Sequence, residues 1–243
     1  MNVATGAFLN AIGILAGALF GLAQRAPPSA RVQDFLRRAL GAATAFFGLR
    51  LVWLNVNGTF WPCARQILIA LLAIVLGNLA GKILSLQKIS NRLGRIAGNR
   101  IAARQSTAPQ RAGDGFLACT VLFCAAPLGL LGAVTDGLAG DFYLLAVKAV
   151  MDGLAMVTFV KLFRWPVALT AVPVFLFLNG LALSLHYGIQ PWLDANDLTG
   201  SINVAAGFVT CLVPLVIFEV RRVELNSYLP AIFIAPLLKF WLG

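Results

Sequence analysis

The sequence is divided into apolar blocks that are about as long as the hydrocarbon core of a membrane is thick. A helix needs roughly 20 predominantly apolar residues to cross that core, and it satisfies its backbone hydrogen bonds within one segment. The blocks therefore predict an all-α polytopic membrane protein with about eight transmembrane helices. They are Val3–Leu22, Ala39–Val56, Ile67–Gly81, Gly115–Thr135, Phe142–Val160, Trp165–Leu185, Leu198–Phe218 and Leu225–Leu238.

Composition excludes a soluble globular domain. Of the 243 residues, 60% are hydrophobic and 12% are charged, whereas soluble domains are typically about 45–50% apolar and about 25% charged. So few polar residues cannot cover the surface of a water-soluble core. We expect one integral membrane domain to occupy residues 1–243, with the lipid bilayer as its main surroundings.

The net charge of +10 does not indicate nucleic-acid binding, because the charges lie in short connections between apolar blocks and not on one basic face. Most Lys and Arg residues fall in alternate connections, namely Arg25, Arg31, Arg37 and Arg38, then Lys82, Lys88, Arg92, Arg95, Arg100, Arg104 and Arg111, then Lys161 and Arg164, then Arg221 and Arg222. Basic connections face the cytoplasm. The alternation supports eight crossings and predicts a multi-pass protein of the bacterial inner (cytoplasmic) membrane, with both termini outside the cytoplasm.

The longest basic connection, residues 85–113, leaves two interpretations open. Ile89, Leu93, Ile96 and Ile101 follow helical spacing, while the arginines lie on other faces, so an amphipathic helix on anionic headgroups is one interpretation. The other is a solvated loop that only sets orientation. From Ser106 to Gly113 the sequence becomes polar and contains a proline, which predicts a linker.

A short internal similarity suggests a repeat. Phe8-Leu9-Asn10 in the first block recurs as Phe177-Leu178-Asn179 in the sixth. An odd number of crossings separates the two blocks, so residues 1–84 and 165–243 would form inverted three-helix repeats around a central hairpin, residues 114–162, as in many transporters. The amides of Asn10 and Asn179 have two interpretations: a hydrogen bond between helices, which is the more ordinary one, or contact with a transported solute.

The fourth block contains Pro127 with several glycines on its C-terminal side. Proline lacks a backbone N–H and disrupts the helix around it. In a membrane, freed carbonyls are tolerated only where protein or a water-lined cavity satisfies them. The block therefore predicts a broken helix that forms a binding element, and the alternative is a plain proline kink packed by small residues.

Two charged residues, Lys148 and Asp152, lie inside the fifth block. Their spacing of four places them on one helical face, where they pair. A charge near the bilayer centre costs about 2.5–3.5 kcal/mol on insertion scales, which makes it a functional candidate, although a buried ion pair is also a known structural element. Asp136 and Asp141 flank the same hairpin, where they would attract cations or, for Asp141, cap the next helix.

The most specific motif is Phe123-Cys124-Ala125-Ala126-Pro127-Leu128-Gly129-Leu130-Leu131-Gly132, followed by Asp136-Gly137, Gly140-Asp141, Lys148 and Asp152-Gly153. This motif resembles the signature of the YqgA-type bacterial inner-membrane proteins, a family of unknown function. The segments Gly6 to Gly21 and Leu229 to Pro236 also look similar, so nearly the whole chain is covered. Family members often have Gly before the proline, where this chain has Ala126. The resemblance implies a multi-spanning bacterial inner-membrane protein and no particular substrate.

These observations favour a transporter or channel for an ion or small polar solute. Its pathway would include Lys148, Asp152, Asn10, Asn179, Pro127, Asp136 and Asp141. The alternative is a non-transporting membrane scaffold or partner-binding subunit. We expect no enzymatic activity, catalytic residue, cofactor or metal site, because the sequence holds no nucleophile–base set, phosphate loop or metal-ligand cluster. Eight short helices enclose little volume, which favours a homodimer.

Overall fold

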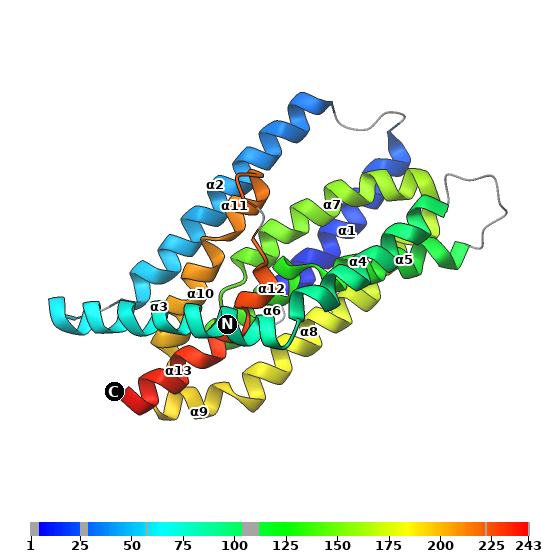
Figure 1. Ribbon diagram of the computed structural model, residues 1–243. Coiled ribbons are helices and arrows are strands. Elements are labelled where there is room, and N and C mark those ends of the chain that lie inside the picture. Colours follow the sequence, from blue (N-terminus) through cyan, green and yellow to red (C-terminus); the bar gives the residue numbers. More distant parts are fainter. Residues whose placement is uncertain (1–4, 25–28, 57, 104–111, 222, 243) are drawn as a thin grey trace.

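The computed structural model describes residues 5–24, 29–56, 58–103, 112–221 and 223–242, and these residues form helices joined by short connections (Figure 1). The all-α prediction is confirmed for this part of the chain. In order, the helices are α1 (Thr5–Ala23), α2 (Ala30–Asn55), α3 (Phe60–Ile83), α4 (Leu86–Ala103), α5 (Ala112–Ala125), α6 (Pro127–Ala139), α7 (Tyr143–Phe163), the 3₁₀ helix η1 (Trp165–Thr170), α8 (Ala171–Gly188), α9 (Gln190–Ala195), α10 (Thr199–Thr210), α11 (Val213–Ile217), α12 (Leu225–Tyr228) and α13 (Pro230–Leu242). Arg25, Arg104, Arg111, Arg222 and most of the expected linker lie outside the described residues.

Six described stretches are long and apolar enough to cross a membrane: Thr5–Ala23, Phe60–Ile83, Tyr143–Phe163, Trp165–Ala195, Thr199–Ile217 and Leu225–Leu242. The bent pair of α5 and α6 makes a seventh if it is counted as one span. The remaining predicted block lies in α2, which has 26 residues but carries several charges in its first turns. The protein is a polytopic membrane protein, and the count of eight, which requires α2 to cross as well, stays a prediction.

The break predicted at Pro127 is present. Ala126 has extended backbone angles (φ −61°, ψ 128°), and Pro127 is the first residue of α6, where its missing N–H costs no helical hydrogen bond. The axes of α5 and α6 differ by 56°. The fourth apolar block therefore consists of two half-helices joined by one extended residue.

Backbone contacts between glycines give the relative direction of α1 and α7. A Cβ on Gly13 would overlap the backbone of Ala149, and a Cβ on Gly17 would overlap that of Gly153. Residue numbers rise together along the two helices, so they are parallel. Within lipid no hydrophobic force drives helices together, so their association depends on close packing. Small residues make this packing possible because they let the two backbones approach.

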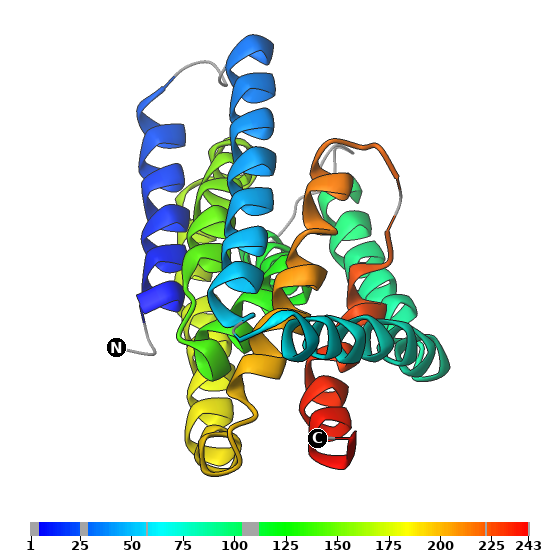
Figure 2. The same cartoon turned by 90° about the vertical axis from the view of Figure 1, so that its left-hand side faces the viewer.

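Two other pairs of helices are antiparallel. Gly77 of α3 lies against Ala231 of α13, and Gly81 lies against Ser227, so the numbers run in opposite senses. Gly48 of α2 and Gly207 of α10 approach each other's carbonyl oxygens, while Gly41, nearer the start of α2, meets Phe218 after α11. Figure 2 shows α2 running beside α10 along much of its length. These directions agree with the alternation expected for eight crossings.

The charges define the two ends of the bundle. α1 ends and α2 begins at one end, and the parallel helix α7 also ends there; we call it the basic end because Arg31, Arg37 and Arg164 belong to it. α5 starts at the basic end, since Gly115 lies against Phe163, the last residue of α7. It runs into the bundle, and Phe123 near its end meets Lys148 of α7. The helix break therefore lies at the depth of the charged pair.

The connection after α3 contains a helix, α4, that contacts α5 (Figure 1). A purely solvated loop is therefore wrong for residues 86–103, and the expected position on lipid headgroups stays a prediction. Ser85, with φ of 54°, turns the chain between α3 and α4. Ser90 Oγ donates a hydrogen bond of 3.1 Å to the carbonyl oxygen of Ala125, the last residue of α5. This bond ties α4 to the helix break.

Candidate functional site

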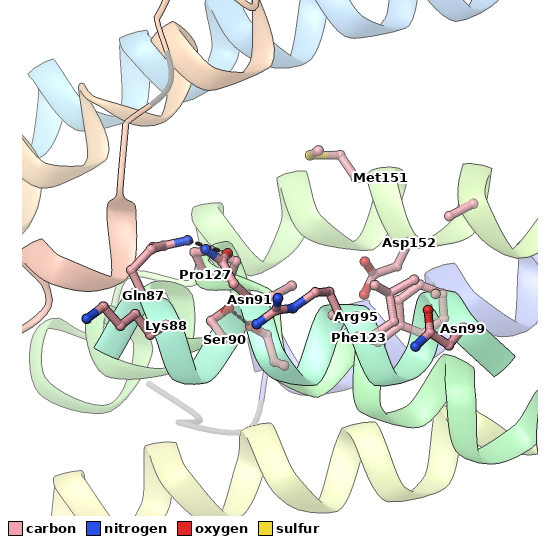
Figure 3. A pocket seen from close by; sticks show the side chains of 16 residues that line it. Gln87, Lys88, Ser90, Asn91, Arg95, Asn99, Phe123, Pro127, Met151 and Asp152 are labelled. Atoms are coloured by element: carbon pink, nitrogen blue, oxygen red, sulfur yellow. Dashed lines mark hydrogen bonds between the residues drawn. The ribbon is translucent and has the colours of Figure 1, made fainter. Parts of the chain in front are cut away.

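A cleft of about 1090 Å³ lies between α4, the junction of α5 with α6, and the middle of α7. Figure 3 shows its side chains, with Asp152 on α7 facing the polar residues of α4. Pro127 and Ala126 form part of the same wall. The cleft thus brings together the helix break and the charged helix, two features that the sequence places about 25 residues apart.

The Lys148–Asp152 pair is formed as predicted. Lys148 Nζ donates to Asp152 Oδ2 and makes an ion pair with it. The same ammonium lies 5.5 Å from the centroid of the Phe123 ring, a cation–π distance. Lys148 is only 1% exposed and Asp152 7%, yet Asp152 also lines the cleft. The lysine therefore lies behind the carboxylate, which separates it from the cleft.

Asn10 of α1 completes this charged group from the opposite side. Its side chain is fully buried and its amide lies near the Asp152 carboxylate. The two groups fall short of hydrogen-bond geometry, and neither Nδ2 nor Oδ1 of Asn10 has a partner within the described part of the chain. Because Asn10 lies on α1 and Asp152 on α7, this polar contact links two helices, as the ordinary interpretation of Asn10 expects.

Gly129 explains why the break can approach the lysine. A Cβ at this position would lie 2.6 Å from Lys148 Cε and 3.4 Å from Leu178 of α8. The first turn of α6 therefore rests directly on the lysine stem. From the sequence, Pro127 and Lys148 are expected only to lie at a similar depth in the membrane. The contact of Gly129 with Lys148 shows that the helix break and the lysine are also adjacent in space.

The polar wall of the cleft comes from α4, and the sequence interpretation did not include it in the site. Gln87, Asn91, Arg95 and Asn99 follow one another at intervals of four along this helix (Figure 3), so they share one face over about 18 Å. Ile89 and Ile96, by contrast, are 54% and 43% exposed. A helix in a soluble protein would bury its apolar face, whereas the first part of α4 exposes its isoleucines and turns its polar face toward the cleft; only near its end does Ile101 pack against the core. The spacing of four between these polar residues is the sequence feature that could have predicted a polar helix face here.

Asp136 and Asp141 lie away from the cleft, toward the end of the bundle opposite the basic end. Asp136 is 2% exposed, and its Oδ2 accepts a hydrogen bond of 3.2 Å from the Gly6 N–H in the first turn of α1. It therefore caps α1. Asp141 Oδ1 accepts a bond of 3.1 Å from the Tyr143 N–H, the capping role expected for it. Burial raises the pKa of the Asp141 carboxyl above its usual value, although the Tyr143 N–H and the nearby Arg50 act in the opposite direction.

Asn179 is half-buried on α8, and its Oδ1 has no hydrogen-bond partner among the described residues. Its neighbour Leu178 is the α8 residue that meets Gly129, so Asn179 is at the depth of the site without lining the cleft. The predicted residues therefore separate into a group around Asp152, formed by Lys148, Asn10 and the Pro127 break, and three others with different surroundings.

Comparison with known proteins identifies the family. The sequence matches the family described as "Protein of unknown function (DUF554)" over residues 5–240. The chain belongs to this family. The match covers nearly the whole chain and confirms the resemblance noted from the central motif.

Two relatives match over almost their full length. The "Uncharacterized membrane protein YdfK" of Bacillus subtilis (strain 168) is 23% identical over 236 residues, covering 97% of this chain and 95% of the relative. The "Uncharacterized protein YqgA" of Escherichia coli (strain K12) is 28% identical over 240 residues, covering 97% of each. No solved structure matches the chain.

Proposed function

We propose that this membrane protein is a transporter or channel that moves an ion or small polar solute across the bilayer. The observation that carries the proposal is the cleft: a buried carboxylate halfway along α7 borders an open volume of about 1090 Å³. A charge at mid-membrane depth is retained where water, a partner or a passing solute meets it. Asp152 has both a partner, Lys148, and contact with the cleft.

The helix break supports the same proposal. Transporters commonly place discontinuous helices around a site near the bilayer midplane, because the ends of half-helices offer free backbone groups to a solute. Here α5 ends and α6 begins at the cleft wall beside Lys148. The buried amide of Asn10, close to the Asp152 carboxylate, adds a further polar group at this depth.

The helix pairing supports an inverted repeat as part of this proposal. α1 contacts α8, α2 contacts α10 and α3 contacts α13, so each helix of residues 1–84 meets its expected counterpart in residues 165–243. The mutual approach of Gly48 and Gly207 is the contact that a two-fold axis between the repeats would produce. In this arrangement the hairpin of α5 to α7 lies between the repeats and carries the charged pair.

Flux measurements test the function. The purified protein would be reconstituted in liposomes and subjected to gradients of sodium chloride, potassium chloride, potassium acetate and potassium phosphate, each with and without a pH gradient. We expect one of these gradients to give a protein-dependent current or flux. Asp152→Asn should lower it by at least about tenfold, equivalent to about 1.4 kcal/mol.

The matched control is Asp34→Asn, which removes an exposed carboxylate of α2 and should leave flux unchanged. Unchanged flux in a folded Asp152→Asn protein would remove the charged pair from the mechanism. Absence of flux under every gradient, together with co-purification of a stable partner, would favour the scaffold function instead.

The proposal also covers the orientation of the protein in the membrane, the membrane in which it lies and its assembly. We propose that the basic end faces the cytoplasm of a bacterial cell, with both termini on the other side of the inner membrane, because basic connections remain cytoplasmic. Reporter fusions at the two termini that respond only inside or only outside the cytoplasm would test this. A homodimer, without enzymatic activity, is the assembly that we expect, and cross-linking in native membranes would detect it.

A further inference from the structure

The charges around the cleft are not balanced. Among the described residues, its lining holds two cationic side chains, Lys88 and Arg95, and one carboxylate, Asp152. The carboxylate is already neutralised by Lys148, which lies directly behind it. The charges of Lys88 and Arg95 therefore remain, and neither side chain makes an ion pair or hydrogen bond within the described part of the chain.

Two uncharged polar side chains of the same wall, Gln87 and Asn91, already use their acceptor oxygens. Asn91 Oδ1 accepts a bond of 3.0 Å from Gln87 Nε2, which leaves the Asn91 N–H₂ group without an acceptor among the described residues. The side-chain oxygen Oε1 of Gln87 accepts a hydrogen bond of 3.3 Å from the Asn226 N–H. The amide oxygens of Gln87 and Asn91 are thus occupied, while the N–H donors of Asn91 lie one helical turn from Arg95. Asn99, one turn farther along α4, presents both an amide donor and an amide acceptor to the cleft.

From this arrangement we infer that the cleft binds a small oxyanion, of the carboxylate or phosphate class, with Arg95 as its principal contact. The guanidinium of an arginine presents two parallel N–H groups that match the two oxygens of a carboxylate or phosphate. Lys88 adds a second positive charge, and Asn91 adds neutral donors from the same helix face (Figure 3). The inference names the substrate class of the proposed transporter and rests on that proposed function.

A cation fits the same wall less well. A metal or alkali cation in the cleft would need oxygen ligands, but the one carboxylate among the described lining residues is already paired with Lys148. It would also approach Lys88 and Arg95. The charges of the wall therefore oppose a cation and attract an anion, whose local concentration rises in a cleft of one sign.

Orientation is the competing explanation for these basic residues, because cationic side chains near helix ends also set topology. The sequence offers a matched pair to separate the two explanations. Arg92 and Arg95 are on the same helix, three residues apart, and both are exposed, but only Arg95 lines the cleft. An orientation signal treats the two arginines alike, whereas a binding site does not.

The experiment measures anion binding to purified protein in an uncharged, lipid-free detergent. Inorganic phosphate and acetate would be titrated while thermal unfolding and calorimetric heat are recorded. We expect at least one of the two anions to raise the melting temperature. Arg95→Gln should weaken its binding about tenfold or more, as expected for loss of a charge-assisted hydrogen bond, and Arg92→Gln should bind like the parent protein.

A second arm distinguishes a free anion from a lipid headgroup. Nanodiscs of phosphatidylglycerol and of phosphatidylcholine would be compared without added anion. Stabilisation by phosphatidylglycerol alone, lost in Arg95→Gln and kept in Arg92→Gln, would support the oxyanion site with a lipid phosphate as its source. No binding in either arm, or equal loss in both variants, would overturn the inference.

The outcomes also separate this inference from the proposed function. Phosphate or acetate binding at Arg95 in a protein that shows no flux under any gradient would leave the site standing and reject transport. Flux of sodium or potassium that depends on Asp152, without anion binding, would keep transport and reject the oxyanion site.

Discussion

The two faces of α7 differ in how they meet the rest of the molecule. One face lies on α1, where Ala149 and Gly153 touch the backbone at Gly13 and Gly17. The other presents Met151, Asp152 and Ala155 to the cleft. Asp152 and Gly153 are neighbours in sequence, yet one meets an open volume and the other is packed against a backbone.

This difference indicates a division of labour within one helix. In lipid, close packing of small residues provides the association of helices that the hydrophobic effect provides in water, so the α1 face holds α7 in place. The other side of α7 carries the buried charges, which cost energy to keep within the membrane. We therefore expect substitutions on the α1 face to affect folding alone, and substitutions of the charged pair to affect solute movement as well.

The largest expected effect is on the α1 face. Gly17→Leu would force a side chain into the backbone of Gly153. Because α1 and α7 would have to separate, the cost should exceed the about 1–3 kcal/mol of ordinary core overpacking and prevent native folding. We expect a large drop in the melting temperature and a loss of monodisperse protein on size exclusion. Gly180→Leu on α8, where nothing lies within 4 Å of the added Cβ, is the control and should behave like the parent. Equal behaviour of the two variants would contradict the packing described for α1 and α7.

The next effect concerns the buried pair. Lys148→Met leaves the Asp152 carboxylate buried without its ammonium, and breaking a buried pair in this way costs about 3–5 kcal/mol. Lys148→Met combined with Asp152→Leu removes both charges and should recover most of that loss. Unfolding in a denaturing detergent measures the stability of each variant. The double variant should nevertheless lack flux. Its stability returns because no unpaired charge remains buried, whereas the proposed transport needs the charges themselves.

Sequence patterns were sufficient for the fold class and for the local geometry at the centre of the candidate site. Block length predicted the helices, Pro127 marked the break, and the spacing of Lys148 and Asp152 predicted their pairing, because each depends on local geometry. The contribution of α4 to the cleft depends on tertiary packing. For this segment the sequence left open an interfacial helix or a solvated loop, and neither interpretation included it in the site. The sequence also did not separate Asn10 from Asn179, since the surroundings of an amide depend on which helix it faces.

A smaller effect tests whether water reaches the cleft. In a protein whose Cys63, Cys119, Cys124 and Cys211 are replaced by Ala, single cysteines would be introduced at Asn91 and at Ile96. Asn91→Cys should react with a charged thiol reagent about tenfold faster or more than Ile96→Cys, because thiol reactions need the solvated thiolate and Ile96 lies on the apolar outer face. The rates are measured by mass shift over time. Similar rates at the two positions would mean that the polar face of α4 does not border an aqueous volume.

The smallest effect concerns a carboxylate that the sequence placed in the pathway. Asp136 accepts the Gly6 N–H, and an acidic side chain near a helix N-terminus contributes about 0.3–1 kcal/mol, up to about 2 where it is partly buried. Asp136→Asn keeps an acceptor oxygen and removes only the charge. We therefore expect a slightly lower melting temperature and unchanged flux. A loss of flux as large as that of Asp152→Asn would show that the solute passes the start of α1 as well, and the site would then extend from the cleft to the opposite end of the bundle.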